Sequence, residues 1–467
     1  MSARISHIPF YEKLVVADYW LYLAGITYAV PIFLFYSWRP IAGIAYAVFP
    51  LAILLVVHAP TTLAAVIIAS FLFIPLTQPI VLLPADAMAL LLILAYIIDL
   101  LVRGSSLRRN LLVRPYLVYI LVMVVSILLE NFTFLSVRYF ARQLVLFGTF
   151  MAAAHFVPRI RIRNYLIIFV IAAGFNGFIS LSQFLASGGW MRTFGLAGLG
   201  FGDHAMLAVL ISTVCYVWSR DLRMRWLWTL AIVCVLGALI ATQTRASMIT
   251  AGWGLMVIVI TSWMTTRHTG DRGPRKNLLH AGLSFLLIIS LLIAFTPIFS
   301  GVMYRFGRMG LQATGTILER MTLWKAALTA FTENPFFGIG IGNYPMIYNW
   351  VPEIRFDHIY YLVTGLSPHA ISLGSLAETG IFGFISLSVF YFYAIRTARR
   401  NFYNAESRYD IVTTHALYII ALVIVGSSIY AGSWFWGNNS YHMAIFFGFI
   451  AGYRNRIPAP VAGGTGG

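Results

Sequence analysis

The sequence predicts an all-α polytopic membrane protein with about twelve to fourteen transmembrane helices. Apolar residues make up 60% of the 467 residues, charged residues only 10%, and the mean hydropathy is +0.83. Soluble domains carry about 25% charged residues, and disordered chains are far less apolar than this one. Because about 20 apolar residues cross a bilayer, the chain is long enough for a dozen spans or more and one larger loop.

The apolar stretches divide the chain into about fourteen candidate helices. They cover 19–36, 41–57, 61–78, 86–102, 115–130, 138–157, 165–186, 204–218, 226–242, 248–266, 279–299, 371–395, 411–430 and 441–453. The first stretch is long enough to span and more spans follow it, so we interpret it as a retained helix. The expected organisation is a transmembrane bundle over 1–299, a loop with amphipathic helices over 300–368, further transmembrane helices over 369–457 and a disordered tail over 458–467.

The net charge of +17 comes from short basic clusters between the apolar stretches. These clusters are Arg103/Arg108/Arg109/Arg114, Arg159/Arg161/Arg163, Arg220/Arg223/Arg225, Arg267/Arg272/Arg275/Lys276, Arg396/Arg399/Arg400 and Arg454/Arg456. An even number of predicted spans separates each neighbouring pair, so all the clusters and both termini can face the cytoplasm, as the positive-inside rule requires. The charge therefore indicates membrane orientation and not nucleic-acid binding.

This topology leaves a second set of basic residues on the opposite, trans side. They are Arg138, Arg142, Arg192, Arg245, Arg305, Arg308, Arg320, Lys325 and Arg355. Positive charge on that side opposes the orientation bias, and few acidic residues accompany it. Lipid phosphates or nearby carboxylates would explain any one of these residues, but the group as a whole favours an anion site.

The larger loop contains two patterned segments. Met321–Leu328 has apolar residues at helical spacing, which predicts an amphipathic helix resting on the membrane or on the bundle. Gly338-Ile339-Gly340-Ile341-Gly342-Asn343-Tyr344 lacks the G-x-G-x-x-G spacing of a nucleotide site, and a tightly packed turn explains its glycines.

No pattern in the sequence predicts a cofactor or a metal ion. Asp203 and His204 are adjacent, and adjacent residues on a helix point in different directions. Cys215 and Cys234 lie inside apolar runs and indicate neither a disulfide nor a zinc site.

Four residues could carry chemistry. His369 follows Pro368 at the expected first turn of a membrane helix, and Glu378 lies deeper, where a charge must face the protein interior or water. A lone histidine is usually structural, but one beside an anion site suits a general base. Arg245 occupies a near-absent loop between two apolar helices, where its partner is either a carboxylate such as Glu130 or a phosphate. A similar argument applies to Arg192.

Several of these motifs together resemble the bacterial O-antigen ligase and O-antigen polymerase superfamily. The resemblance covers roughly 190–385 and rests on Arg320 with Trp324, Asn334-Pro335 through Tyr344, Pro368-His369 with Glu378 and Gly380, Arg192-Thr193-Phe194-Gly195, and Thr244-Arg245. Two positions depart from the family pattern. Ala370 stands where an Asn usually follows the histidine, and Gly202-Asp203-His204 replaces an Asn-Pro-Asn-like turn.

The resemblance implies a GT-C-like fold and a metal-independent glycosyltransferase in the bacterial inner membrane. Such an enzyme moves a glycan from undecaprenyl diphosphate to a sugar hydroxyl, either of lipid A-core or of a growing polysaccharide, at the periplasmic face. It implies His369 as general base and Arg192 and Arg245 as the residues that stabilise the leaving diphosphate. Arg320, Arg308, Arg305, Glu378, Tyr344 and Trp324 are the expected substrate-binding residues.

Three alternatives remain open. The aromatic residues of the loop stack on sugars or form an interfacial belt. The acceptor distinguishes a ligase from a polymerase, and the sequence does not reveal it. A transporter or flippase for lipid-linked sugars or anions is the rival function, although the two halves of the chain lack the symmetry of inverted repeats.

Overall fold

The computed structural model describes residues 58–72, 84–103, 111–130, 133–187, 192–269, 273–280, 282, 312–349, 368–430 and 439–453. These residues form helices and connecting turns with no β-strand among them, which confirms the all-α class. The α-helices are α3 (Ala59–Ala69), α4 (Pro84–Arg103), α5 (Val113–Leu129), α6 (Phe134–Phe156), α7 (Ile162–Ala186), α8 (Phe201–Trp218), α9 (Leu222–Thr242), α10 (Arg245–Thr269), α13 (Gln312–Glu333), α15 (Ile371–Tyr403), α16 (Arg408–Ser427) and α18 (Asn439–Tyr453). The 3-10 helices are η1 (Val157–Arg159), η2 (Gly198–Gly200) and η4 (Tyr344–Asn349).

Eight helices of the described chain are long and apolar enough to cross a membrane. They are α4, α6 with η1, α7, α8, α9, α10, α15 and α16, and the shorter helices α3 and α5 are also apolar. The chain is therefore a multi-pass membrane protein. The predicted spans 19–36 and 41–57 lie outside the described residues, as do most of the span 279–299 and the tail 458–467, so the total of about twelve to fourteen spans stays a prediction.

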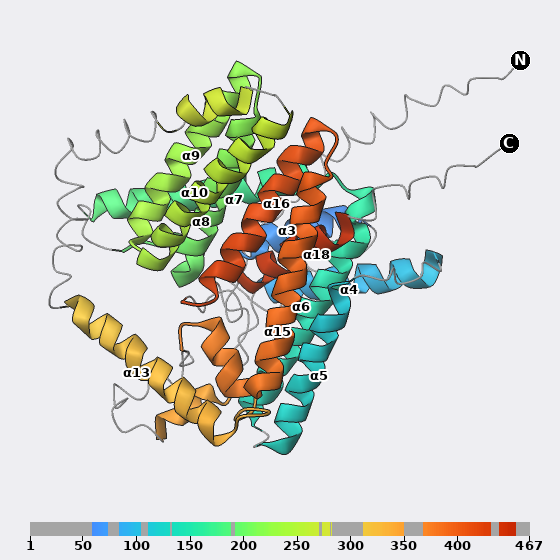
Figure 1. Ribbon diagram of the computed structural model, residues 1–467, viewed down its shortest axis with the longest axis vertical. Helices are drawn as coiled ribbons and strands as arrows, with labels where there is room; N and C mark the ends of the chain where they lie inside the picture. Colours follow the sequence, from blue (N-terminus) through green and yellow to red (C-terminus); the bar gives the residue numbers. More distant parts are fainter. Residues whose placement is uncertain are drawn as a thin grey trace, which may run out of the picture.

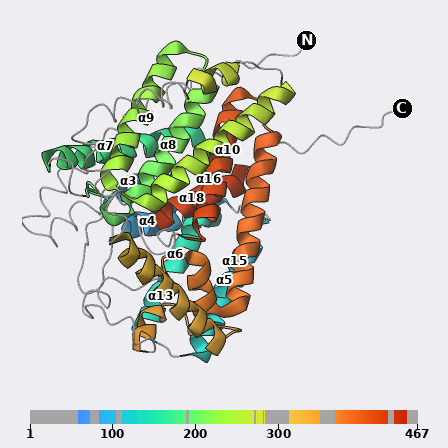
Figure 2. The same ribbon diagram turned by 60° about the vertical axis from the view of Figure 1, so that its left-hand side comes forward.

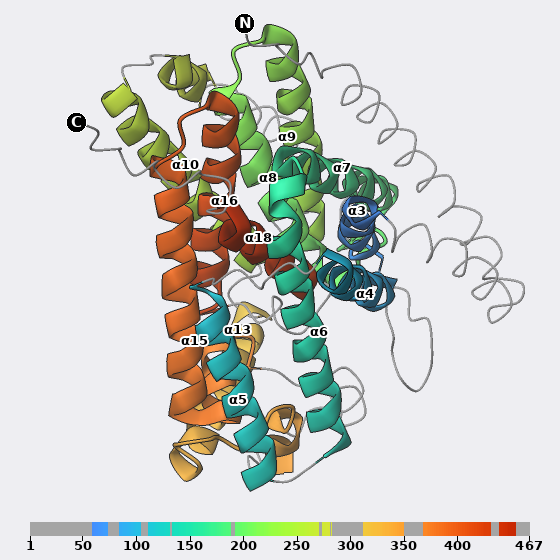
Figure 3. The same cartoon turned by 90° about the vertical axis from the view of Figure 1, so that its right-hand side faces the viewer.

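Helix α8 lies at the centre of one half of the bundle. Every residue of this helix is buried, and α7, α9, α10 and α16 pack around it. In the other half, α18 packs against α6, and α5 packs against α15. Helices α5, α6 and α15 extend beyond the ends of α8 and α16, and α13 lies across that end of the molecule (Figures 1 and 3). Figure 2 shows the same arrangement from the side of α10 and α13. We refer to this end as the α13 end.

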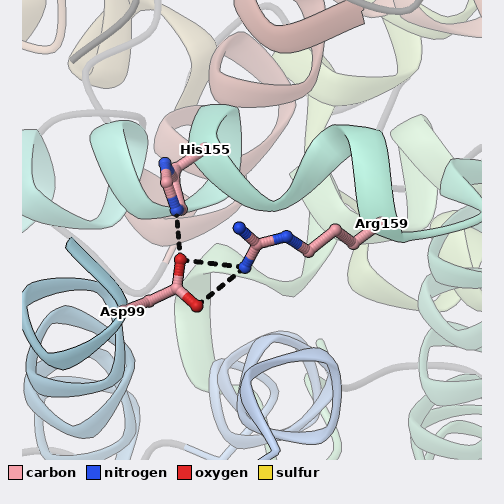
Figure 4. A network of polar contacts seen from close by, with 3 residues as sticks. All are labelled: Asp99, His155 and Arg159. Carbon is pink, nitrogen blue, oxygen red and sulfur yellow. Dashed lines mark hydrogen bonds and ion pairs between the residues drawn. The ribbon is translucent and has the colours of Figure 1, made fainter. Parts of the chain in front are cut away.

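The opposite end of the bundle gathers the described basic clusters. Asp99, near the end of α4, accepts hydrogen bonds from Arg159 Nη1 at 2.8 Å and lies 2.7 Å from Nε2 of His155 on α6 (Figure 4). At the same end, Arg408 donates to the carbonyl of Trp218, the last residue of α8.

Candidate active site

The turn between α9 and α10 places Arg245 at the α13 end. Gln243 adopts a left-handed conformation with φ 50°, which ends α9 and lets α10 begin at Arg245 two residues later. The Arg245 side chain is half-exposed, and no hydrogen bond or ion pair occupies its guanidinium within the described part of the chain. The carboxylate that the sequence offers as its partner, Glu130, lies instead beside Gly340, about 3.4 Å from a Cβ built there.

Arg192 lies against the same turn. Its Nε donates to the carbonyl of Thr242 at 3.1 Å, its Nη2 lies 3.4 Å from Thr244 Oγ1, and its guanidinium sits 5.0 Å from the ring centre of Phe194. The side chain is exposed, so the outer face of the guanidinium reaches solvent. The structure therefore brings Arg192 and Arg245, separated by more than fifty residues in the sequence, to one turn.

The first turns of α8 and α10 are fastened together beneath these arginines. Ser247 Oγ donates to Asp203 Oδ1 at 2.6 Å, and both side chains are buried. A Cβ on Gly202 would lie only 2.8 Å from the side chain of Thr244, so the two helices approach as closely as glycine allows. The amide groups at the start of α10 carry a partial positive charge and lie near the two guanidiniums. Together these groups can bind an anion such as a diphosphate.

Sequence reasoning missed the bond between Ser247 and Asp203. Its only signal was a serine in the first turn of α10 and an acidic residue in the first turn of α8. His204 points elsewhere, into packing with the rings of Phe71 and His442 at centroid distances of 4.6 and 4.5 Å. Within the described ranges, no group of three His, Cys, Asp or Glu residues is arranged to hold a metal ion.

His369 lies in a turn before α15, not inside the helix. The helix predicted over 371–395 begins where expected, at Ile371, with the extended residue Ala370 as its N-cap, so Pro368 marks the entry to the helix and precedes its first turn. His369 itself is left-handed, with φ 51°, a conformation that histidine tolerates better than most residues. Its side chain is exposed.

Helix α16 connects the two arginines with His369. The hydroxyl of Tyr430, just after α16, hydrogen-bonds Thr250 Oγ1, which lies five residues, or about 7.5 Å along α10, from Arg245. The carbonyl of Ser428, at the same end of α16, accepts from the amide of Ser372 at 3.2 Å. Ser372 follows His369 by three residues. The arginine pair and the histidine therefore share the α13 end of three packed helices.

The glycine-rich loop that follows α13 packs against a kink in α15. Gly380 interrupts the helix with φ 64° and ψ −164°, and the amide of Ile381 that the kink frees donates to Pro335 O at 2.8 Å. In return, Ile339 donates to the carbonyl of Ala377 at 3.0 Å. Cβ atoms on Gly338 or Gly380 would lie within 2.6 Å of the facing backbone, so these glycines serve close backbone packing, as the tight-turn interpretation predicts.

Glu378 and Tyr344 lie inside this packing. Glu378 is 4% exposed and its Oε1 accepts from the amide of Tyr344 at 3.2 Å, while the hydroxyl of Tyr344 donates to Leu323 O at 2.6 Å. Burial and, secondly, the Glu378 carboxylate raise the pKa of the Tyr344 phenol above its usual range, so the phenol remains a hydrogen-bond donor. Both residues are buried and hold the loop in place.

Helix α13 confirms the helix predicted over Met321–Leu328, but it buries a different face. Its buried side chains are Leu323, Ala326, Ala327 and Ala330. Met321 and Leu328 are exposed, and Trp324 is half-buried with its Nε1 donating to Pro368 O at 2.8 Å. Arg320 lies half-exposed on the same helix. Arg305 and Arg308 lie outside the described residues.

One comparison with known protein families finds a match. Residues 230–388 match the family model described as O-antigen ligase, and no curated protein matches the chain. The matched segment contains Arg245, Trp324, the glycine-rich loop and His369, whereas Arg192 precedes it. The chain is therefore a multi-pass membrane protein in which residues 230–388 are similar to the O-antigen ligase family.

Proposed function

We propose that this protein is a metal-independent glycosyltransferase of the bacterial inner membrane. It takes a glycan from undecaprenyl diphosphate and transfers it to a sugar hydroxyl of lipid A-core or of a growing polysaccharide. The α13 end faces the periplasm, because the described basic clusters lie at the other end of the bundle and basic loops stay in the cytoplasm. The observation that carries the proposal is the pair Arg192 and Arg245 on one turn, at the same end as His369.

The residues divide the reaction between them. The acceptor hydroxyl oxygen bonds to the anomeric carbon, its proton passes to the imidazole of His369, and the bond from that carbon to the diphosphate oxygen breaks. Negative charge then grows on the diphosphate, which Arg192, Arg245 and the amides at the start of α10 bind. A guanidinium suits this role because its fork of donors binds two phosphate oxygens at once.

The loop residues complete the donor site in this proposal. Arg320 on α13, with Arg305 and Arg308 earlier in the loop, adds positive charge around the sugar diphosphate. Glu378 and Tyr344 shape the site from inside the packed loop, since both are buried. The aromatic face of Trp324 borders the turn that carries His369.

A transfer assay with purified protein tests the proposal. The donor is a glycan on undecaprenyl diphosphate, and lipid A-core and a second lipid-linked repeat unit serve as alternative acceptors. We expect a new glycosidic bond with one of them in the presence of a chelator and without nucleotide. We expect His369→Ala to lower the rate about 10²- to 10⁴-fold, the range for loss of a general base.

A vesicle assay separates this function from that of a transporter. Movement of the lipid-linked sugar across the vesicle, with no new glycosidic bond, would reject the transferase. Near-normal transfer by His369→Ala would reject the histidine as base but not the reaction. Met321→Ala, on the exposed flank of α13, is the matched control and should transfer at the parent rate.

A further inference from the structure

The turn that carries His369 precedes the first turn of α15. Ala370, the N-cap of α15, has no side-chain cap, and His369 stands outside the helical hydrogen-bond pattern with φ 51°. A base must lie within hydrogen-bond reach of the proton it accepts, so the backbone that carries this imidazole needs support.

That support reaches the preceding residue, Pro368, from two sides. Proline has no amide N–H, so its carbonyl is its one polar backbone group, and Trp324 Nε1 donates to it at 2.8 Å. On the other side the Pro368 ring rests against the first turn of α15, where its Cγ lies 3.3 Å from the position of a Cβ on Gly374. Pro368 itself is buried, and Trp324 is half-buried.

Tyr344 and Glu378 hold the segment of α13 that carries Trp324. The carbonyl of its neighbour Leu323 accepts the Tyr344 hydroxyl at 2.6 Å, and the amide of Tyr344 donates to Glu378 at 3.2 Å. Glu378 belongs to the same helix, α15, whose start carries His369. The contacts therefore run from α15 through η4 and α13 and back to the turn before α15.

We propose that Trp324 is a positioning residue for His369, with Tyr344 and Glu378 holding α13 so that the indole fixes the Pro368 carbonyl. This inference rests on the proposed function, in which His369 is the base. It assigns to Trp324, Tyr344 and Glu378 a part in directing the base, where the sequence analysis expects contact with substrate. A displacement of a catalytic group by about 1 Å can lower a rate about 10²-fold, which sets the scale of the expected effect.

Trp324→Phe separates positioning from substrate contact, because phenylalanine keeps an aromatic face and loses only the N–H donor. We expect kcat to fall about ten- to a hundredfold with the donor and acceptor KM unchanged. Replacement of Trp324 by the sulfur isostere benzothienylalanine keeps the ring shape and should lower kcat equally in a protein with the parent melting temperature. Met321→Ala is again the control on α13.

The transfer rate of a double mutant distinguishes a positioning role from a merely structural one. Residues that act as one unit lose activity once, so Trp324→Phe should lower the residual rate of His369→Ala no further. The positioning role would be overturned if Trp324→Phe lowered the rate of His369→Ala by the same factor as it lowers the parent rate. It would also be overturned if either Trp324 variant kept the parent kcat, or raised KM with kcat unchanged. If the parent protein forms no glycosidic bond, or His369→Ala equals it, the proposed function fails first, and the positioning role with it.

Discussion

Replacement of Gly380 by alanine should be among the most damaging single-methyl changes in the chain. The residue has φ 64° and ψ −164°, a region that side chains avoid, and a Cβ there would lie 2.3 Å from Phe336 O and 2.6 Å from the amide of Phe337. The backbone strain alone is worth about 1–3 kcal/mol. Moving the facing backbone adds about 1–3 kcal/mol, the usual range for overpacking. The sum is a loss of about 2–6 kcal/mol of stability.

The loss should also reach the active site, because the segment that follows His369 joins the rest of α15 through this kink. Thermal unfolding of detergent-purified protein, followed by tryptophan fluorescence, measures the stability, and the transfer assay measures activity. Gly252→Ala in α10 is the matched control, since nothing lies within 4 Å of a Cβ there. That variant should be neutral or stabilised by up to about 1 kcal/mol. A Gly380→Ala variant that melts with the parent and transfers at the parent rate would refute the reasoning.

Further variants test the anion site and the loop separately. Arg245→Ala should lower kcat about 10²- to 10³-fold in steady-state transfer, and Arg245→Lys should restore little, because lysine lacks the fork; full activity of the lysine variant would contradict phosphate binding there. Arg192→Lys removes the Nε–H that anchors the side chain to the Thr242 carbonyl, so one charge-assisted hydrogen bond is lost, and we expect the transfer rate to fall about tenfold. Ser247→Ala removes a hydrogen bond to the buried carboxylate of Asp203 and should lower stability by about 1.5–3 kcal/mol and weaken donor binding; an unchanged donor KM would argue against that link. Asn343→Ala removes the acceptor of the Thr133 and Ser136 hydroxyls and the donor to the Ile339 carbonyl, which should lower stability by about 1–3 kcal/mol in thermal unfolding, while activity per folded molecule stays at the parent value.

The helices could be predicted because their signal is local. A membrane span needs a continuous apolar run, and most described helices follow such runs with shifts of up to about four residues at their ends. Two predictions are further off, because α3 ends at Ala69 and not at 78, and α15 continues to Tyr403 and not to 395. The end of α9 at Thr242 was predictable from the polar Thr-Gln-Thr-Arg sequence, and so was the interior position of Glu378, because an exposed charge in the membrane is costly. His369 and Arg245 could be selected as candidate site residues because an ionisable side chain at the end of an apolar helix is costly there unless it has a polar partner or a function.

The rest depends on contacts between segments far apart in the sequence. Gly380 is a common residue in membrane helices, and nothing near it reveals that Phe336 lies against it. The half-exposed Trp324 suggested sugar stacking, and only the fold shows its indole on the Pro368 carbonyl. Pro368 marks the entry to α15, but only the fold shows that it precedes a left-handed histidine. In each case the sequence indicates the chemical properties of the residue but not the distant residue that it contacts.

The close fit between the glycine-rich loop and α15 changes how mutagenesis of this region should be interpreted. A scan of 338–344 will yield many inactive variants, and the motif will look like a catalytic signature although its glycines contact only backbone and neighbouring side chains. The activity of each variant in this segment has to be divided by the amount of correctly folded protein before a loss is interpreted as an effect on the chemical step. Conversely, a substitution in this segment that restores folding at low temperature should restore transfer as well, because no reacting atom has been removed.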